Sequence, residues 1–137
     1  MGFTQLMEAR DAVTVLIADD SGLFAAALEA VLSGEEEIRV IGIAANGEEA
    51  LALAREYAPD VALMDISMPV MDGFEAARLI TAELPRTAVL MLTGSAAEDD
   101  KRQAKAAGAA GYVTKDQMAV ALVRVIKEVA ADRRPLS

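Results

Sequence analysis

Apolar residues along the chain fall into short continuous runs separated by longer stretches with helical periodicity. The central run, residues 61–69, contains Asp65 and Ser67 as its only residues with polar side chains and follows Pro59-Asp60. A continuous apolar run of this kind predicts a strand buried on both faces of a parallel sheet, and we place the end of this strand at Asp65. Similar runs predict four further strands, at residues 13–18, 38–44, 87–92 and 112–115.

Helices with recognisable boundaries connect these predicted strands. Ser21 is a candidate cap for the first helix, and Asn46 with Glu49 three residues later forms a capping-box pattern for the second, which Pro59 ends. The fourth helix has only alanines on its apolar side, so it should be the least firmly anchored. We expect helices at about residues 22–32, 47–57, 73–83 and 97–107, and a last helix capped by Asp116.

The alternation of five strands with five helices predicts the fold class. Sequential strands joined by right-handed helical crossovers form a doubly wound α/β structure with a five-stranded parallel sheet. No repeat and no internal boundary interrupts the pattern, so we expect one domain at residues 13–131. Residues 1–12 lack periodicity and are interpreted as a flexible tail, and residues 132–137 as the start of a linker.

Charge and composition restrict the function further. The 137 residues include 13 Lys plus Arg and 22 Asp plus Glu, a net charge of −9, which disfavours direct binding of nucleic acid. Cysteine and histidine are both absent, so thiol chemistry and imidazole ligands are excluded and a reducing cytoplasm is the expected location. No apolar stretch is long enough to cross a bilayer, so we expect no membrane association.

Reactive side chains follow four of the predicted strands. Asp19 and Asp20 follow the first strand, Asp65 ends the third, and Thr93 and Lys115 stand at the ends of the fourth and fifth. The carboxyl ends of parallel strands meet at one edge, where three close carboxylates need a cation. Mg²⁺ suits oxygen ligands and phosphate, so the pattern predicts a magnesium site at which the Asp65 carboxylate attacks phosphorus and forms an acyl phosphate.

These motifs resemble the receiver domain of two-component response regulators. The resemblance rests on Asp19-Asp20, on residues 64–69 with Asp72-Gly73, on residues 92–95 and on residues 112–115, and it spans about residues 13–130. It implies the CheY-like, flavodoxin-like strand order 2-1-3-4-5. Residues 108–116 and 134–137 are similar to the helix-turn-helix (NarL/FixJ-type) transcription regulators, so DNA would be contacted only through an output domain absent from this chain.

The resemblance also implies roles for individual residues. Asp65 would accept a phosphoryl group from the phosphohistidine of a histidine kinase, and Mg²⁺ would be held by Asp19 or Asp20, by Asp65 and by the Ser67 carbonyl. Lys115 would pair with the phosphoryl oxygens. Thr93 would close on them and draw Tyr112 inward, which makes Thr93 and Tyr112 the switch residues. The domain would then be no enzyme beyond its own phosphorylation and autodephosphorylation, the latter favoured because Ser67 and Ser95 are small.

The sequence is also compared with three other classes of protein. A haloacid-dehalogenase-type phosphatase needs a second acid two residues after the nucleophile, where Ser67 stands. A flavodoxin-like FMN carrier needs a phosphate loop where Asp19-Asp20 stand. A phosphorylation-independent interaction module on the same fold is the main alternative, because the presence of all the site residues does not prove that Asp65 is phosphorylated.

Two expectations concern the helices and the last loop. The first helix carries Glu29 as its single charge, and the last helix has apolar residues on a second side, so these two helices are candidates for a homodimer contact. Many relatives have proline after the lysine, often with a cis peptide. Here Asp116 follows Lys115, and because a cis bond before a residue other than proline costs about 3 kcal/mol, we expect a trans peptide.

Overall fold

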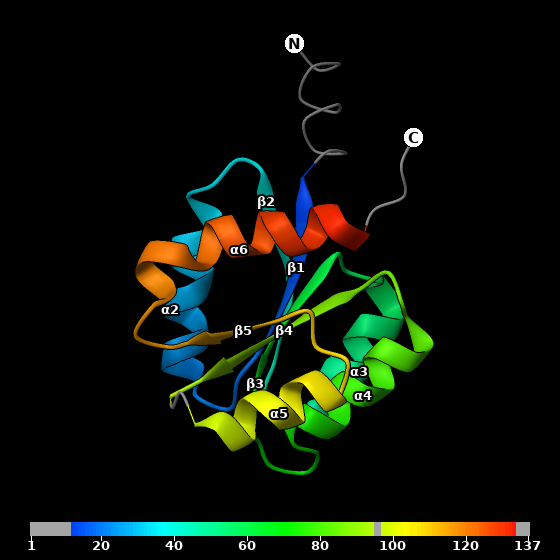
Figure 1. The fold of residues 1–137 in the computed structure, drawn as a ribbon. Helices are drawn as coiled ribbons and strands as arrows, with labels where there is room; N and C mark the ends of the chain where they lie inside the picture. The colour runs from blue at the N-terminus through cyan, green and yellow to red at the C-terminus, as the bar shows by residue number, and fades with distance from the viewer. Residues whose placement is uncertain (1–11, 95–96, 134–137) are drawn as a thin grey trace.

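A five-stranded parallel sheet forms the centre of the computed structural model, which describes residues 12–94 and 97–133 (Figure 1). The strand order is β2-β1-β3-β4-β5, which confirms the predicted doubly wound topology. All four pairings between neighbouring strands are parallel. The strands are β1 (Val13–Ala18), β2 (Ile38–Ala44), β3 (Val61–Asp65), β4 (Ala88–Thr93) and β5 (Gly111–Thr114).

Helices cover both faces of the sheet. In Figure 1, α2 and α6 lie on one face, and α3, α4 and α5 lie on the other. Because each strand is flanked by helical layers, β3 and β4 are buried along their whole length, as their continuous apolar sequences predict. The helices are α2 (Gly22–Ser33), α3 (Gly47–Tyr57), α4 (Gly73–Glu83), α5 (Glu98–Ala106) and α6 (Met118–Arg133).

Two hydrophobic cores result from the alternation of side chains along the strands. Val15 and Ile17 of β1 pack on the side of α2 and α6, and Leu16 and Ala18 pack on the side of α3, α4 and α5. Each of these four side chains is completely buried. The sheet is therefore fixed from both sides, and this holds the ends of its strands in place.

Polar caps define where the helices begin. The Ser21 hydroxyl accepts a hydrogen bond from the Phe24 N–H at 3.2 Å, and Asn46 Oδ1 accepts one from the Glu49 N–H at 2.8 Å. The Glu49 carboxylate in turn accepts from the Ala45 N–H at 2.9 Å, so the capping box closes one residue earlier than the pattern predicts. Both predicted caps are confirmed.

The ends of the domain differ in detail from the prediction. Helix α6 begins at Met118, so Gln117 directly precedes it, whereas we expected Asp116 as the cap. The same helix continues through Arg133 into the segment interpreted as a linker. Ala12, the last residue of the predicted tail, is buried. The predictions for residues 1–11 and 134–137 lie outside the described residues, and among those described, none of the helices could span a membrane.

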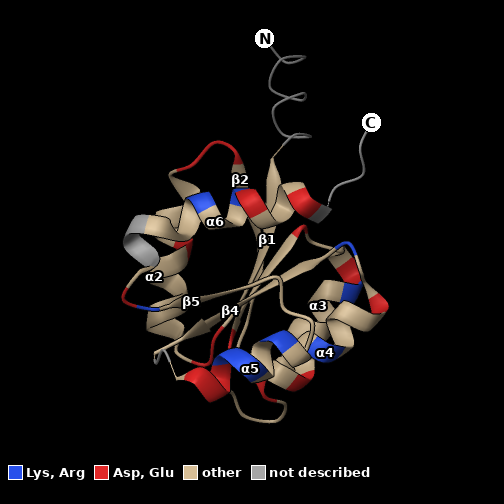
Figure 2. Cartoon of the chain, viewed as in Figure 1, with Lys and Arg blue, Asp and Glu red and all other residues tan. Residues whose placement is uncertain are grey.

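Helix α5 has the smallest apolar anchor. Ala104 is its one buried residue, and Ala97 at its start makes no side-chain capping bond. Its first turn carries acidic residues and Lys105 lies in its last turn, which complements the helix dipole (Figure 2). The expected weak anchoring of this helix is confirmed by its burial pattern.

Ala58 offers a test of local backbone strain. This exposed residue ends α3 with a positive φ of 44°, a conformation that costs a residue with a Cβ atom and that glycine adopts readily. We expect Ala58→Gly to raise the free energy of unfolding by about 0.5–1 kcal/mol in urea titrations. The matched variant Ala52→Gly, at an exposed position inside the same helix, should lower it by about 1 kcal/mol. Destabilisation by Ala58→Gly would contradict this interpretation.

Candidate functional site

The carboxyl edge of the sheet gathers the three carboxylates singled out in the sequence. Asp19 and Asp20 directly follow β1, and Asp65 is the last residue of β3, its neighbour in the sheet. One carboxylate oxygen from each residue lies within 4.8 Å of the others. Asp19 and Asp65 are buried and Asp20 is exposed, so the cluster is open to solvent on the Asp20 side.

Lys115 supplies a positive charge to this cluster. Its Nζ lies 3.0 Å from Asp19 Oδ2 and 3.4 Å from Asp65 Oδ1. The Lys115 backbone N–H also donates to the Thr93 carbonyl at 2.6 Å, which joins the end of β5 to the end of β4. The second carboxylate oxygen of Asp19 accepts a hydrogen bond from the Ser21 N–H at 2.8 Å. Asp19 is thus fixed at both oxygens before any ligand binds.

Electrostatics at the cluster favour additional positive charge. Burial raises the pKa of Asp65, the negative charge of Asp19 raises it further, and the attraction of Lys115 only partly opposes this. Burial alone would lower the pKa of Lys115, but its hydrogen bond to Asp19 and the charge of Asp65 outweigh that effect and raise it. The ammonium therefore stays charged, and one ammonium does not balance three carboxylates.

The donor set fits a hard divalent cation. Three carboxylates that converge within 4.8 Å offer oxygen ligands and an excess of negative charge, which is the chemistry that Mg²⁺ prefers. The exposed position of Asp20 leaves room for the water molecules that Mg²⁺ retains.

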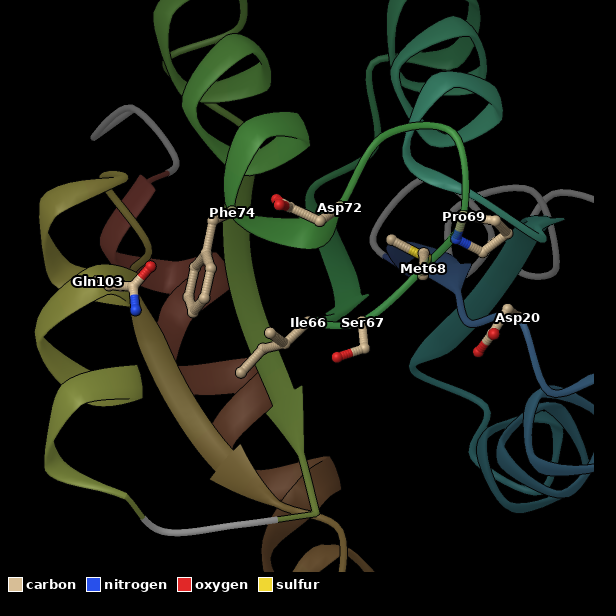
Figure 3. A pocket seen from close by; sticks show the side chains of 8 residues that line it. All are labelled: Asp20, Ile66, Ser67, Met68, Pro69, Asp72, Phe74 and Gln103. Atoms are coloured by element: carbon tan, nitrogen blue, oxygen red, sulfur yellow. The ribbon is translucent and has the colours of Figure 1, made fainter.

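Ser67 lines a recess that begins beside this cluster. The recess has a volume of about 630 Å³ and runs from Asp20 past Ser67 and Ile66 to Phe74 and, on α5, Gln103 (Figure 3). The carboxylate site is therefore connected to the weakly anchored helix by an open surface depression.

Close backbone contacts fix the loop that contains Ser67. The Gly73 N–H donates to the Ile66 carbonyl at 2.8 Å, and a Cβ atom at Gly73 would overlap the Asp65 carbonyl oxygen. The Gly47 N–H donates to the Met71 carbonyl at 2.9 Å, which ties the same loop to α3. Glycine is required at both positions, because any side chain would push the loop away from the carboxylates.

The two predicted switch residues occupy different environments. Thr93 ends β4 and is 5% exposed, and its carbonyl holds Lys115. Tyr112 is half-buried in β5, packs against the core on the α5 side and lines a smaller recess with Lys101 and Lys105. Ser95, predicted to admit water to the site, lies outside the described residues. The Lys115–Asp116 peptide is trans, as expected.

Sequence reasoning missed one side chain at this site. The Phe24 ring of α2 lies beneath the Lys115 ammonium, with Nζ 4.2 Å from the ring centroid. In the sequence Phe24 is only one more apolar residue of the first helix. The sequence feature that could have identified Phe24 is its position three residues after the cap Ser21. This position places Phe24 in the helical turn next to Asp19-Asp20.

Comparison with known proteins gives a consistent result. The family model of the response regulator receiver domain matches residues 15–127. The chain is 40% identical over 117 residues to the transcriptional regulatory protein LnrK of Bacillus subtilis, which covers 85% of this chain and 53% of that protein. It is 37% identical over 125 residues to the response regulator GacA of Pseudomonas aeruginosa, covering 91% of this chain and 58% of that protein.

Solved structures of related domains have the same fold. The response regulator domain of Thermotoga maritima CheB matches with a TM-score of 0.81 and 30% identity, covering 88% of this chain and 97% of that chain. A two-component response regulator of the LuxR family from Aurantimonas sp. SI85-9A1 matches with a TM-score of 0.84 and 30% identity. The match covers 92% of this chain and 90% of that chain. The chain spans little more than half the length of LnrK and GacA. On these grounds the chain belongs to the family of response regulator receiver domains of two-component signalling.

Proposed function

We propose that Asp65 accepts a phosphoryl group from the phosphohistidine of a partner histidine kinase. An Asp65 carboxylate oxygen attacks phosphorus, the phosphorus–nitrogen bond breaks, and the histidine nitrogen leaves with the electron pair and takes up a proton. The observation that carries this proposal is the placement of Asp65 beside both a carboxylate pair and the Lys115 ammonium. Membership in the receiver family supports the same chemistry.

The reaction would depend on Mg²⁺. Asp19, Asp20, Asp65 and the Ser67 backbone carbonyl are the groups that would hold the ion. Bound there, it would neutralise the charge that develops on the phosphoryl oxygens. Removal of divalent ions with a chelator should therefore stop phosphorylation.

Lys115 and Thr93 would act on the product. The Lys115 ammonium would exchange its contact with Asp65 for an ion pair with a phosphoryl oxygen. The Thr93 hydroxyl would donate a hydrogen bond to a second phosphoryl oxygen. A phosphoryl group carries a charge near −1.5 to −2, enough to bias a two-state surface. We place that surface at Tyr112 and α5, because α5 has the smallest apolar anchor and borders the recess that leads from the acid site.

The output of this switch would be control of transcription. LnrK is a transcriptional regulatory protein, and the relatives extend well beyond the matched region. In this proposal DNA is bound only by a further domain, since this chain carries a net charge of −9. The cytoplasm is the proposed location, where a chain without cysteine is suited to reducing conditions.

Phosphorylation is also proposed to favour a homodimer through α2 and α6. Leu23 is 87% exposed and Val31 50% exposed, and Ala27 lies between them on the same exposed side of α2. Their spacing of four residues makes a continuous apolar stripe. On α6, Val123 packs partly against the core, so α2 would provide most of the apolar contact.

Acetyl phosphate tests the acceptor assignment. With Mg²⁺, the wild-type protein should gain one phosphoryl group by intact mass, and Asp65→Asn should gain none, because the nucleophile is lost. Asp60→Asn, at the residue just before the other end of the same strand, is the matched control and should be modified like the wild type. If the wild type stays unmodified and beryllofluoride shifts no amide resonance near Thr93 and Tyr112, the chain acts as a phosphorylation-independent interaction module.

Asp65→Asn should also change the pH dependence of stability. The raised pKa of Asp65 means that the folded state binds its proton more tightly than the unfolded state, so ionisation of Asp65 costs stability as the pH rises. With a chelator present to remove divalent cations, Asp65→Asn should unfold at a higher urea concentration than the wild type at pH 7. This advantage should shrink as the pH falls towards about 3.9, the ordinary pKa of aspartate. A difference that is constant with pH would contradict the assigned electrostatics.

Sedimentation tests the dimer. The phosphorylated or beryllofluoride-treated protein should associate at concentrations where the untreated protein is monomeric. Ala27→Glu should prevent association, because it buries a charge in the apolar stripe, and should leave phosphorylation by acetyl phosphate intact. A strict monomer under both conditions at high concentration would exclude this contact.

A further inference from the structure

The Lys115 ammonium lies against three different groups. Two are carboxylates, with Asp19 Oδ2 at 3.0 Å and Asp65 Oδ1 at 3.4 Å, and the third is the Phe24 ring, whose centroid lies 4.2 Å away. An ammonium within about 6 Å of an aromatic centroid is attracted by the negative face of the ring. The lysine side chain is 27% exposed, so solvent only partly screens these interactions.

The position of the Phe24 ring is itself fixed by the structure. Phe24 is in the first turn of α2, where its N–H donates to the hydroxyl of the cap residue Ser21 at 3.2 Å. Its side chain packs against the core between the sheet and helices α2 and α6. Ser21 also donates its N–H to Asp19, so the same cap orients the ring and one of the carboxylates that face Lys115. The cap and the core packing together hold the Phe24 ring beside the longer and more mobile lysine side chain.

We propose that Phe24 is a positioning residue that keeps the Lys115 ammonium at the acceptor site by a cation–π contact. This inference rests on the proposed phosphoryl transfer to Asp65. A divalent cation bound to Asp19 and Asp65 would neutralise the two charges that otherwise attract Lys115, whereas the attraction of the ring does not depend on them. Without the ring, the long and flexible lysine side chain would let the ammonium move out to solvent. The ammonium would then spend less time in the position that contacts the phosphoryl oxygens.

Three variants separate this role from simple packing. Phe24→Leu keeps an apolar side chain and removes the aromatic face, and Phe24→Tyr keeps the face. Val40→Ala removes apolar volume at a half-buried position packed against the same core, far along the sequence from Lys115, and controls for a general loss of stability. Phe24→Met serves in place of Phe24→Leu if the leucine variant does not fold by its amide spectrum.

The first readout is the rate of phosphorylation by acetyl phosphate with Mg²⁺. Phe24→Leu should slow it about threefold to tenfold, the range expected for loss of a partly exposed cation–π contact, and Phe24→Tyr should restore it. Val40→Ala should react at the wild-type rate. In a Lys115→Ala background, Phe24→Leu should have no further effect on the residual rate, because the ring acts through the ammonium.

The second readout does not require phosphorylation. The methylene protons next to the Lys115 nitrogen should show an upfield ring-current shift in the wild type and in Phe24→Tyr, with and without Mg²⁺, and should lose it in Phe24→Leu. An unshifted Lys115 in the wild type, a wild-type rate in Phe24→Leu, or an equal rate loss in the Lys115→Ala background would overturn the assignment. Failure of the wild type to accept phosphate, with the ring-current shift present, would instead overturn the proposed function and leave the placement of Phe24 supported.

Discussion

Uncompensated negative charge at the carboxyl edge of the sheet is the constraint on which the rest of the site depends. Three carboxylates converge within 4.8 Å, and Lys115 is the ammonium that contacts two of them. The sheet holds them there because β1 and β3 are buried on both faces and cannot shift to relieve the repulsion. The repulsion between these carboxylates lowers the stability of the fold, and the excess negative charge is available to attract an incoming cation.

The same constraint explains the surroundings of the carboxylates. Asp19 is bound at both oxygens, by the Ser21 N–H and by Lys115, whereas Asp20 is exposed. The loop after Asp65 is held by the close approach of Gly73 to the Asp65 carbonyl. Rigid groups therefore line the buried side of the site, and its solvent side is open to ligands.

Much of this architecture follows from the sequence because its signals are local. The continuous apolar runs of β3 and β4 predict burial on both faces, and the caps Ser21 and Asn46 fix two helix starts. Convergence of Asp19, Asp20, Asp65 and Lys115 follows from topology alone, since parallel strands end at one edge. Helix α6 begins later than the expected cap Asp116 implies, because residues 115–117 form a turn after β5 and the helix starts only at Met118.

Contacts between segments that are distant in the sequence could not be predicted from the sequence. The approach of the Phe24 ring to Lys115 depends on how the first turn of α2 packs beside the residue after β5, and periodicity does not specify this. The contact of Gly47 with the Met71 carbonyl likewise joins the start of α3 to a loop more than twenty residues later. Such contacts depend on the tertiary packing of otherwise ordinary apolar residues and glycines.

The charge distribution of α5 has a consequence for its response to the solvent. Apolar burial holds the other helices, but α5 buries only Ala104 and relies on acidic residues near its start and Lys105 near its end. Its ion pair between Lys101 and Glu98, at 3.6 Å, is largely exposed. Dissolved ions screen interactions of this kind and leave apolar burial nearly unchanged. Ionic strength therefore acts on α5 more than on any other described helix, so the local salt concentration sets how firmly this part of the surface is held.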